Sequence, residues 1–244
     1  MINIEEALPL PVKSARLIAY STPVGGLVDG MDDVQDLIAY CAKVSNPQFQ
    51  DKFDTSERLL NYLIANQHWS PLEMASATIE IVTTRDIARQ ILRHRSFSFQ
   101  EFSQRYQDVN QLNNPFVLRE TRFQHPTNRQ DSIDINGDDE DQRFTIAEWQ
   151  RRQQEVIDLA SEHYKWALEA HIAKEVARSV LPEGLTVSKL YMHGTIRSWV
   201  HYISLRSGNG TQKEHMLIAR EVAKAIAEIF PMSESMINHT QKGH

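Results

Sequence analysis

Four cationic side chains fall within the fourteen residues RHRSFSFQEFSQRY (93–106): Arg93, His94, Arg95 and Arg105. Serines lie between them, and the stretch has a single acidic residue, although the whole chain carries a formal net charge of −6 over 244 residues. Guanidinium groups beside hydroxyls and backbone N–H groups can hold a phosphate through several charge-assisted hydrogen bonds. The stretch therefore indicates a site for a small anionic ligand.

The residues before this stretch predict the helix that must deliver it. TTRDIARQILRHR (83–95) has an apolar face at helical spacing and a candidate N-cap at Thr84. Arg95 would project into that apolar face if the helix continued, and an unpaired buried charge is costly. Serines and alternating phenylalanines follow, which favours a helix end and an extended segment. The arginines at 85, 89 and 93 share the polar side, so a phosphate site and a solvated basic face paired with acids elsewhere both remain open.

Hydrophobic periodicity predicts an α+β chain with several helices and few strands. One candidate strand, ASATIEIV, alternates apolar and polar residues and is expected to be half-buried. We expect a single domain over residues 1–244, with a polar loop at about 125–143. The predicted strands are 15–22 and 75–82, and the predicted helices are 31–45, 54–67, 83–95, 144–174, 186–205 and 211–229.

Composition excludes several classes of protein. No run of eighteen apolar residues is present, and the N-terminal segment is acidic and interrupted by prolines, so neither a membrane span nor a signal peptide is expected. The single cysteine, Cys41, excludes an intramolecular disulfide, and a cytoplasmic location is the simplest interpretation. The negative net charge argues against general nucleic-acid binding, and the histidine spacings indicate no metal site.

The stretch 93–106 resembles the signature of flavin-dependent thymidylate synthases, R-H-R-x-x-S-x-N-E-x-S-x-R-Y. Eight of the nine defined positions agree, and Gln100 stands where the family usually has asparagine. Three further segments resemble family motifs: QHWSPLE (67–73), ARSVLPEGL (177–185) and RSWVHYISLR (197–206). The resemblance spans roughly residues 45 to 215 and implies helices packed on a small, mainly antiparallel sheet.

The resemblance also implies ligands and the residues that contact them. It implies a homotetramer that shares FAD between subunits and binds dUMP, with NADPH and 5,10-methylenetetrahydrofolate as co-substrates. The residues implied for dUMP are Gln90, Ile91, Leu92, Arg93, Glu101, Phe102, Ser103, Gln104, Arg105, Arg178 and Arg206. Those implied for FAD are Ser45, His68, Ser70, Glu73, Arg93, His94, Arg95, Glu101, Thr195, Ile196, Arg197 and His201.

The implied reaction is the reductive methylation of dUMP to dTMP without an enzyme nucleophile. Arg206 is the implied catalytic residue, because a guanidinium beside the uracil ring favours its ionisation at N3. Cys41 lies on the apolar stripe of its predicted helix, which is typical of a small buried side chain rather than of a reactive thiolate. Ser103 has no paired base beside it and is assigned to binding.

Two alternatives to this function remain. Gln100 leaves open a related enzyme that hydroxymethylates the pyrimidine or acts on another nucleotide. A nucleic-acid-binding protein is the more distant alternative, because residues 85–106 contain five arginines and only two acids.

Overall fold

The computed structural model describes residues 14–111, 114–208 and 210–237, which divide into two compact units. The first unit contains residues 14, 82–91 and 101–190, and the second contains residues 15–81, 92–100 and 191–237. The unit boundaries fall within strands β2 (Ser76–Thr84) and β6 (Val187–Thr195). A single domain over residues 1–244 stays a prediction. Within the described residues, no helix is both long and apolar enough to cross a membrane.

Four strands form a sheet in the order β1–β2–β6–β3, where β1 is Ala15–Tyr20 and β3 is Ser98–Glu101. Strands β1 and β2 are antiparallel, with Ala15 opposite Ile81 and Tyr20 opposite Ala77. A bulge between Leu17 and Ala19 shifts the register in the middle of β1.

The predicted alternation along β2 is confirmed on its apolar side. Ala77, Ile79 and Ile81 are fully buried, because successive side chains of a strand point to opposite faces. On the other side Glu80 is only 8% exposed. Its carboxylate accepts hydrogen bonds at 2.9 Å from Arg16 Nη2 and from the Tyr191 hydroxyl, which compensate the buried charge.

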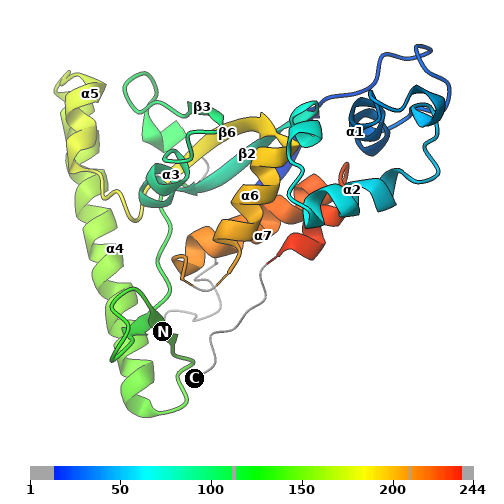
Figure 1. Cartoon of the computed structure of the whole chain (residues 1–244). Coiled ribbons are helices and arrows are strands. Elements are labelled where there is room, and N and C mark those ends of the chain that lie inside the picture. The colour runs from blue at the N-terminus through cyan, green and yellow to red at the C-terminus, as the bar shows by residue number, and fades with distance from the viewer. Residues whose placement is uncertain (1–13, 112–113, 209, 238–244) are drawn as a thin grey trace. The chain divides into compact units, whose positions relative to one another are not determined.

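Helices cover the strands of the second unit. Helix α7 packs against β1 and α6, and α1 packs against α2 (Figure 1). Asp33 caps α1 by accepting a hydrogen bond from the backbone N–H of Asp36 at 2.9 Å. The helices of this unit are α1 (Val34–Ala42), η2 (Pro47–Phe49), α2 (Ser56–Ala65), η3 (Ser70–Glu73), α6 (Ile196–Arg206), α7 (Lys213–Ala227) and η6 (Pro231–Met236).

A long helix dominates the first unit. Helix α4 (Glu140–Glu169) runs 30 residues and packs against α5 (Figure 1). Its apolar stripe, including Tyr164 and Ala167, joins Val109, Ala177 and Leu181 in a buried cluster. The other elements are α3 (Arg85–Ile91), η4 (Val109–Gln111), α5 (Lys174–Ala177), η5 (Arg178–Val180), and the antiparallel pair β4 (Arg122–Gln124) and β5 (Ser132–Asp134).

The helix predicted over 186–205 is wrong in its first half, because residues 187–195 form β6. Leu190, Met192 and Gly194 are buried there, whereas Tyr191 and His193 are exposed. This is the two-residue period of a strand, and the helix begins only at Ile196.

Two local expectations also change. The predicted loop at 125–143 contains β5 and the first turn of α4, which begins at Glu140 and ends at Glu169 rather than at residue 174. The Thr84 hydroxyl does not cap the following helix; it donates to the Asp86 carboxylate at 2.6 Å. The predicted class, α+β with helices on a small, mainly antiparallel sheet, is confirmed.

Candidate functional site

The arginine-rich signature begins where helix α3 ends. The helix stops at Ile91, earlier than the end expected after Arg93, and β3 begins at Ser98, so both Arg93 and Arg95 lie in the connecting turn. Both side chains are exposed. Neither guanidinium has an ion-pair or hydrogen-bond partner among the described residues, so each can receive an anion.

Phe97 anchors this turn inside the second unit. Its ring lies 4.6 Å from the Trp199 ring and 6.0 Å from the Tyr202 ring, both on α6. It also covers Gly194 so closely that an added Cβ there would lie 2.4 Å from Phe97 Cδ1. The Ser198 hydroxyl donates to the Ser96 carbonyl at 3.2 Å. The turn is therefore fixed by α6 and the end of β6.

His94 joins the turn to the end of α6. Arg206 Nε donates to His94 Nε2 at 3.0 Å, and the His94 ring meets the Tyr202 ring edge-on at 5.0 Å. Behind them, the Tyr202 hydroxyl lies 3.2 Å from His215 Nε2 on α7. We call these four residues the His94 cluster.

Burial shapes the protonation of the His94 cluster. It lowers the pKa of His94 to about 4, with a further contribution from the Arg206 charge. It lowers the pKa of His215 to about 3, and the charges of Arg206 and His94 add to the effect. Burial also raises the pKa of Tyr202. Arg206 is therefore the charged member of the cluster near neutral pH.

The start of α6 meets the η3 segment. The Thr195 hydroxyl accepts from the backbone N–H of Ser198 at 3.3 Å and caps the helix. Arg197 forms an ion pair with Glu73, and the His201 ring lies 4.4 Å from the Trp69 ring. Burial, and then the Arg197 charge, lowers the pKa of His201.

The structure thus brings together several residues implied for FAD. Ser70 and Glu73 lie in η3, whereas Ile196 is fully buried and its backbone N–H donates to the Ala75 carbonyl at 2.9 Å. His68 is exposed and contacts Tyr62 edge-on at 6.0 Å, and Ser45 is exposed after α1. All of the residues implied for FAD lie in the second unit, except Glu101.

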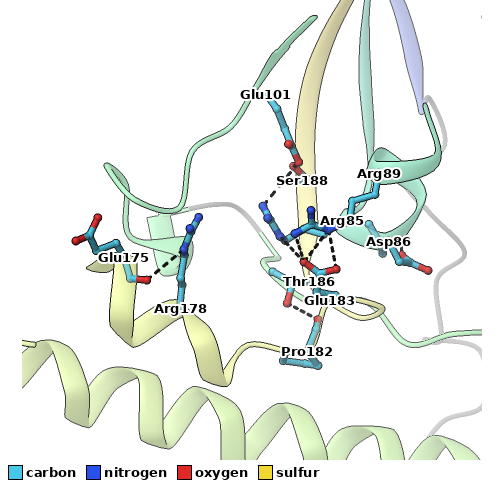
Figure 2. A network of polar contacts seen from close by, with 11 residues as sticks. Arg85, Asp86, Arg89, Glu101, Glu175, Arg178, Pro182, Glu183, Thr186 and Ser188 are labelled. Carbon is cyan, nitrogen blue, oxygen red and sulfur yellow. Dashed lines mark hydrogen bonds and ion pairs between the residues drawn. The ribbon is translucent and has the colours of Figure 1, made fainter. Parts of the chain in front are cut away.

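In the first unit, a polar network holds Glu101 (Figure 2). Its carboxylate accepts from the Ser188 hydroxyl at 2.8 Å and lies 3.7 Å from Arg85 Nη1. Arg85 also faces Glu183, to which Arg89 Nε donates at 2.8 Å. Arg85 and Arg89 are therefore compensated by acids, as the basic-face interpretation predicted, whereas Arg93 and Arg95 have no acidic partner in the part of the chain that the structure describes.

Sequence reasoning missed the residues that hold Glu101. Arg85 was assigned only to the polar side of a helix, and Ser188 fell within a segment predicted to be helical. The alternating pattern of residues 187–195 could have identified the strand and placed Ser188 on its buried side, where it is 1% exposed.

The residues after Glu101 form a turn in the same unit. Phe102 donates its backbone N–H to the Lys189 carbonyl at 2.8 Å, and the Ser103 carbonyl accepts from Tyr106 N at 3.1 Å. Gln104 is 3% exposed, and its Nε2 has no hydrogen-bond partner within the described residues. A buried amide donor normally has a hydrogen-bond partner, so this one needs a partner that the described residues do not supply.

Other residues implied for dUMP lie near this turn or at the end of α3. Arg105 pairs with Glu175 at 3.3 Å, and Arg178 Nε donates weakly to the Glu175 carbonyl at 3.4 Å (Figure 2). Ile91 is fully buried. Gln90 and Leu92 are half-buried.

Cys41 does not have the character of a nucleophile. It is half-buried on α1, and burial raises the pKa of its thiol. The thiol is therefore protonated near neutral pH, whereas the thiolate is the reactive form. Over the described ranges, no group of three or more His, Cys, Asp or Glu side chains could hold a metal ion.

Comparisons of the sequence with known proteins identify its family. A family model described as thymidylate synthase complementing protein matches residues 26–232. A probable flavin-dependent thymidylate synthase of Paramecium bursaria Chlorella virus 1 is 46% identical over 217 residues, which cover 89% of this chain and 93% of the relative. A flavin-dependent thymidylate synthase of Synechocystis sp. (strain PCC 6803) is 45% identical over 197 residues, covering 81% and 86%.

A solved structure shares the fold. The UMP/dUMP methylase PolB from Streptomyces cacaoi, bound with 5-Br dUMP, aligns with a TM-score of 0.72 at 24% identity. The alignment covers 91% of this chain and 93% of that chain.

Proposed function

Because the chain belongs to the family of thymidylate synthase complementing proteins, whose curated relatives are flavin-dependent thymidylate synthases, we propose that it converts dUMP to dTMP. The proposed co-substrates are 5,10-methylenetetrahydrofolate, which supplies the carbon, and NADPH, which supplies the reducing equivalents. FAD is the proposed form of the flavin. The PolB structure, which holds 5-Br dUMP, supports a pyrimidine nucleotide as substrate.

The donor set of the signature turn fits the diphosphate of FAD. Arg93 and Arg95 are exposed and have no carboxylate partner among the described residues, and Ser96 and Ser98 add exposed hydroxyls. A dianionic group binds well to such a set, because charge-assisted hydrogen bonds are roughly twice as strong as neutral ones. Bound flavin supplies hydride chemistry that no amino-acid side chain can perform.

The turn at residues 102–105 fits the phosphate of dUMP. Gln104 offers a buried Nε2 that no described residue bonds, and Ser103 offers a hydroxyl. Arg105 and Arg178 supply positive charge from the same unit. Glu101, fixed by Ser188 and Arg85, keeps this turn in one conformation.

Arg206 is proposed to act on the uracil ring. His94 engages its Nε, which leaves both terminal nitrogens of the planar guanidinium for a ligand. A fixed positive charge beside a uracil carbonyl stabilises the ring anion formed by loss of the N3 proton, and this favours bond formation at C5. Preorganisation by His94 matters because the charge need not reorient during the reaction.

The proposed reaction is balanced. The methylene carbon leaves the folate and bonds to C5, a hydride that originates from NADPH completes the methyl group, and the C5 hydrogen leaves as a proton. The two folate nitrogens released from the carbon take up two protons. The proton lost from C5 balances one of them, and solvent supplies the other. The protonated thiol of Cys41 takes no part.

One observation carries this proposal: the hydrogen bond from Arg206 Nε to His94 Nε2. It joins the arginine-rich signature to the implied catalytic arginine across 112 residues of sequence. Arg206 is half-buried, whereas Arg93 and Arg95 are exposed. Arg93, Arg95 and Arg206 all belong to the second unit.

The test combines a spectrum with a product assay. Purified protein is expected to show flavin absorbance, and with dUMP, methylenetetrahydrofolate and NADPH it should release dTMP, identified by mass. The Cys41→Ala variant should retain turnover within about twofold, since no thiolate is needed. A colourless protein that does not take up FAD, or a product carrying a hydroxymethyl group, would contradict the proposal.

Two further properties are proposed on the resemblance. We expect a homotetramer in which neighbouring subunits share each flavin, and light scattering coupled to size-exclusion chromatography measures its mass. We expect the enzyme to work in the cytoplasm and without bound nucleic acid, which fractionation and the absorbance ratio of the purified protein check.

A further inference from the structure

An open recess lies in the second unit, outside the site described above. It is formed by the end of α1, the 3₁₀ helix η2 and the first turns of α2, and its volume is about 410 Å³. No acidic side chain contributes to its lining. The lining residues are Lys43, Asn46, Phe49, Thr55, Arg58, Leu59 and Tyr62.

The polar side chains of the recess are available to a ligand. Within the described residues, the side chains of Asn46, Thr55 and Arg58 have no hydrogen-bond or ion-pair partner. Thr55 is the N-cap residue of α2, yet its hydroxyl makes no capping bond. Lys43 donates to the Lys52 carbonyl, which leaves two of its three ammonium protons. Two cations and two neutral groups therefore converge without a compensating acid.

The apolar side chains of the recess are unusually exposed. Phe49 is 49% exposed and Tyr62 is 56% exposed, and Leu59 also lines the recess. Covering such rings with a planar group gains both buried apolar area and ring stacking. The recess thus combines flat apolar walls with positive charge, which suits an aromatic ring that carries carboxylates or phosphates.

We propose that this recess binds the p-aminobenzoyl-glutamate half of the folate co-substrate. That half is a flat ring attached to two carboxylates, which matches two exposed rings and the two cations Lys43 and Arg58. The inference rests on the proposed function, because it assigns a site to that reaction's carbon donor. Tyr62 connects the recess to the flavin side, since it contacts His68, which the family resemblance implies for FAD.

The diphosphate of FAD fits the recess less well. Arg93 and Arg95, with the serines beside them, form a better set of phosphate donors in the same unit. Lys43 follows α1 as its C-cap residue, and Arg58 lies in the first turn of α2. A dinucleotide in the recess is therefore the competing outcome of the test.

The test compares folates with and without the glutamate. In the full-length enzyme, Arg58→Gln and Lys43→Gln should each raise the KM for methylenetetrahydrofolate by about 10-fold, because each removes a charge-assisted hydrogen bond. The KM for the corresponding tetrahydropteroate, which lacks glutamate, should not change, nor should kcat or the affinity for FAD. Arg152→Gln, which alters an exposed arginine of α4, is the matched control.

Direct binding separates this inference from the proposed function. By calorimetry, p-aminobenzoyl-glutamate should bind the wild-type chain, and Arg58→Gln should raise its Kd by about 10-fold. If dTMP is made but the fragment does not bind, the recess assignment is wrong and the function stands. If Arg58→Gln weakens FAD instead, the recess holds the dinucleotide and the assignment is also wrong. Fragment binding without dTMP formation would overturn the function alone.

Discussion

The Nε of Arg206 donates to the Nε2 of His94 at 3.0 Å, so the imidazole must carry its proton on Nδ1. A neutral His94 agrees with the direction in which burial and the nearby guanidinium shift its pKa. The hydrogen bond fixes the plane of a cation that has no carboxylate partner among the described residues. A guanidinium held in this way is oriented for a ligand rather than neutralised by the protein.

Replacing Arg206 tests this orientation. Arg206→Lys keeps the charge but loses the planar fork, and kcat for dTMP formation should fall by about 10²- to 10³-fold. Circular dichroism should show an unchanged fold. An Arg152→Lys control on the surface of α4 should retain full activity.

Replacing His94 tests whether it acts by accepting the hydrogen bond from Arg206. His94→Gln can still accept from Arg206 and should keep more activity than His94→Leu, which leaves the guanidinium unpositioned. The measurement is kcat and KM for dUMP in both variants. Equal losses in the two would show that His94 does not act through Arg206.

The Ser188 hydroxyl is expected to position Glu101. Ser188→Ala removes a hydrogen bond to a carboxylate, and the KM for dUMP should rise by about 10-fold with little change in kcat. Ser204→Ala, at an exposed position of α6, is the control. A fall in thermal stability without a change in KM would assign Ser188 a structural role only.

Gly194 is expected to be required because the Phe97 ring leaves no room for a side chain, and not because of backbone strain. Gly194→Ala places a Cβ 2.4 Å from Phe97 and should lower the free energy of unfolding by about 1–3 kcal/mol. Gly184→Ala, where an added Cβ has no atom within 4 Å, should be tolerated. Combining Gly194→Ala with Phe97→Leu should recover part of the loss if the contact is the cause.

The two buried histidines make stability depend on pH. The pKa values of His94 and His215 are lowered from 6.5 to about 4 and about 3, so near pH 5 both are mostly neutral in the folded state and mostly protonated in the unfolded state. The unfolded state therefore binds more protons there, and stability rises with pH from about 4 to about 6.5. Tyr202 and Arg206 are the other titratable groups that face them in the cluster.

Urea unfolding at several pH values measures this slope. His215→Gln should reduce it by up to about 1.4 kcal/mol per pH unit, the contribution of one proton. The exposed His163 of α4 provides a control, since His163→Gln should leave the slope unchanged. An unchanged slope in His215→Gln would show that His215 is already protonated in the folded enzyme.

Local patterns predicted the elements that carry the site. The alternation in β2, the helix that ends before Arg95 and the extended segment after it are all present, because each depends on neighbouring residues. The strand β6 was misassigned for a related reason. Residues 187–195 are followed directly by a true helix, with no loop between the two elements to mark the change of period.

The sequence alone determined the chemistry that is available: a cluster of arginines and serines, a late arginine at position 206 and a cysteine unsuited to nucleophilic attack. Only the tertiary structure decided which arginines are neutralised. Arg85 and Arg89 meet Glu101 and Glu183, whereas Arg206 meets a neutral histidine. Charge compensation depends on distances of a few ångströms between residues far apart in the chain, and spacing along the sequence does not encode those distances.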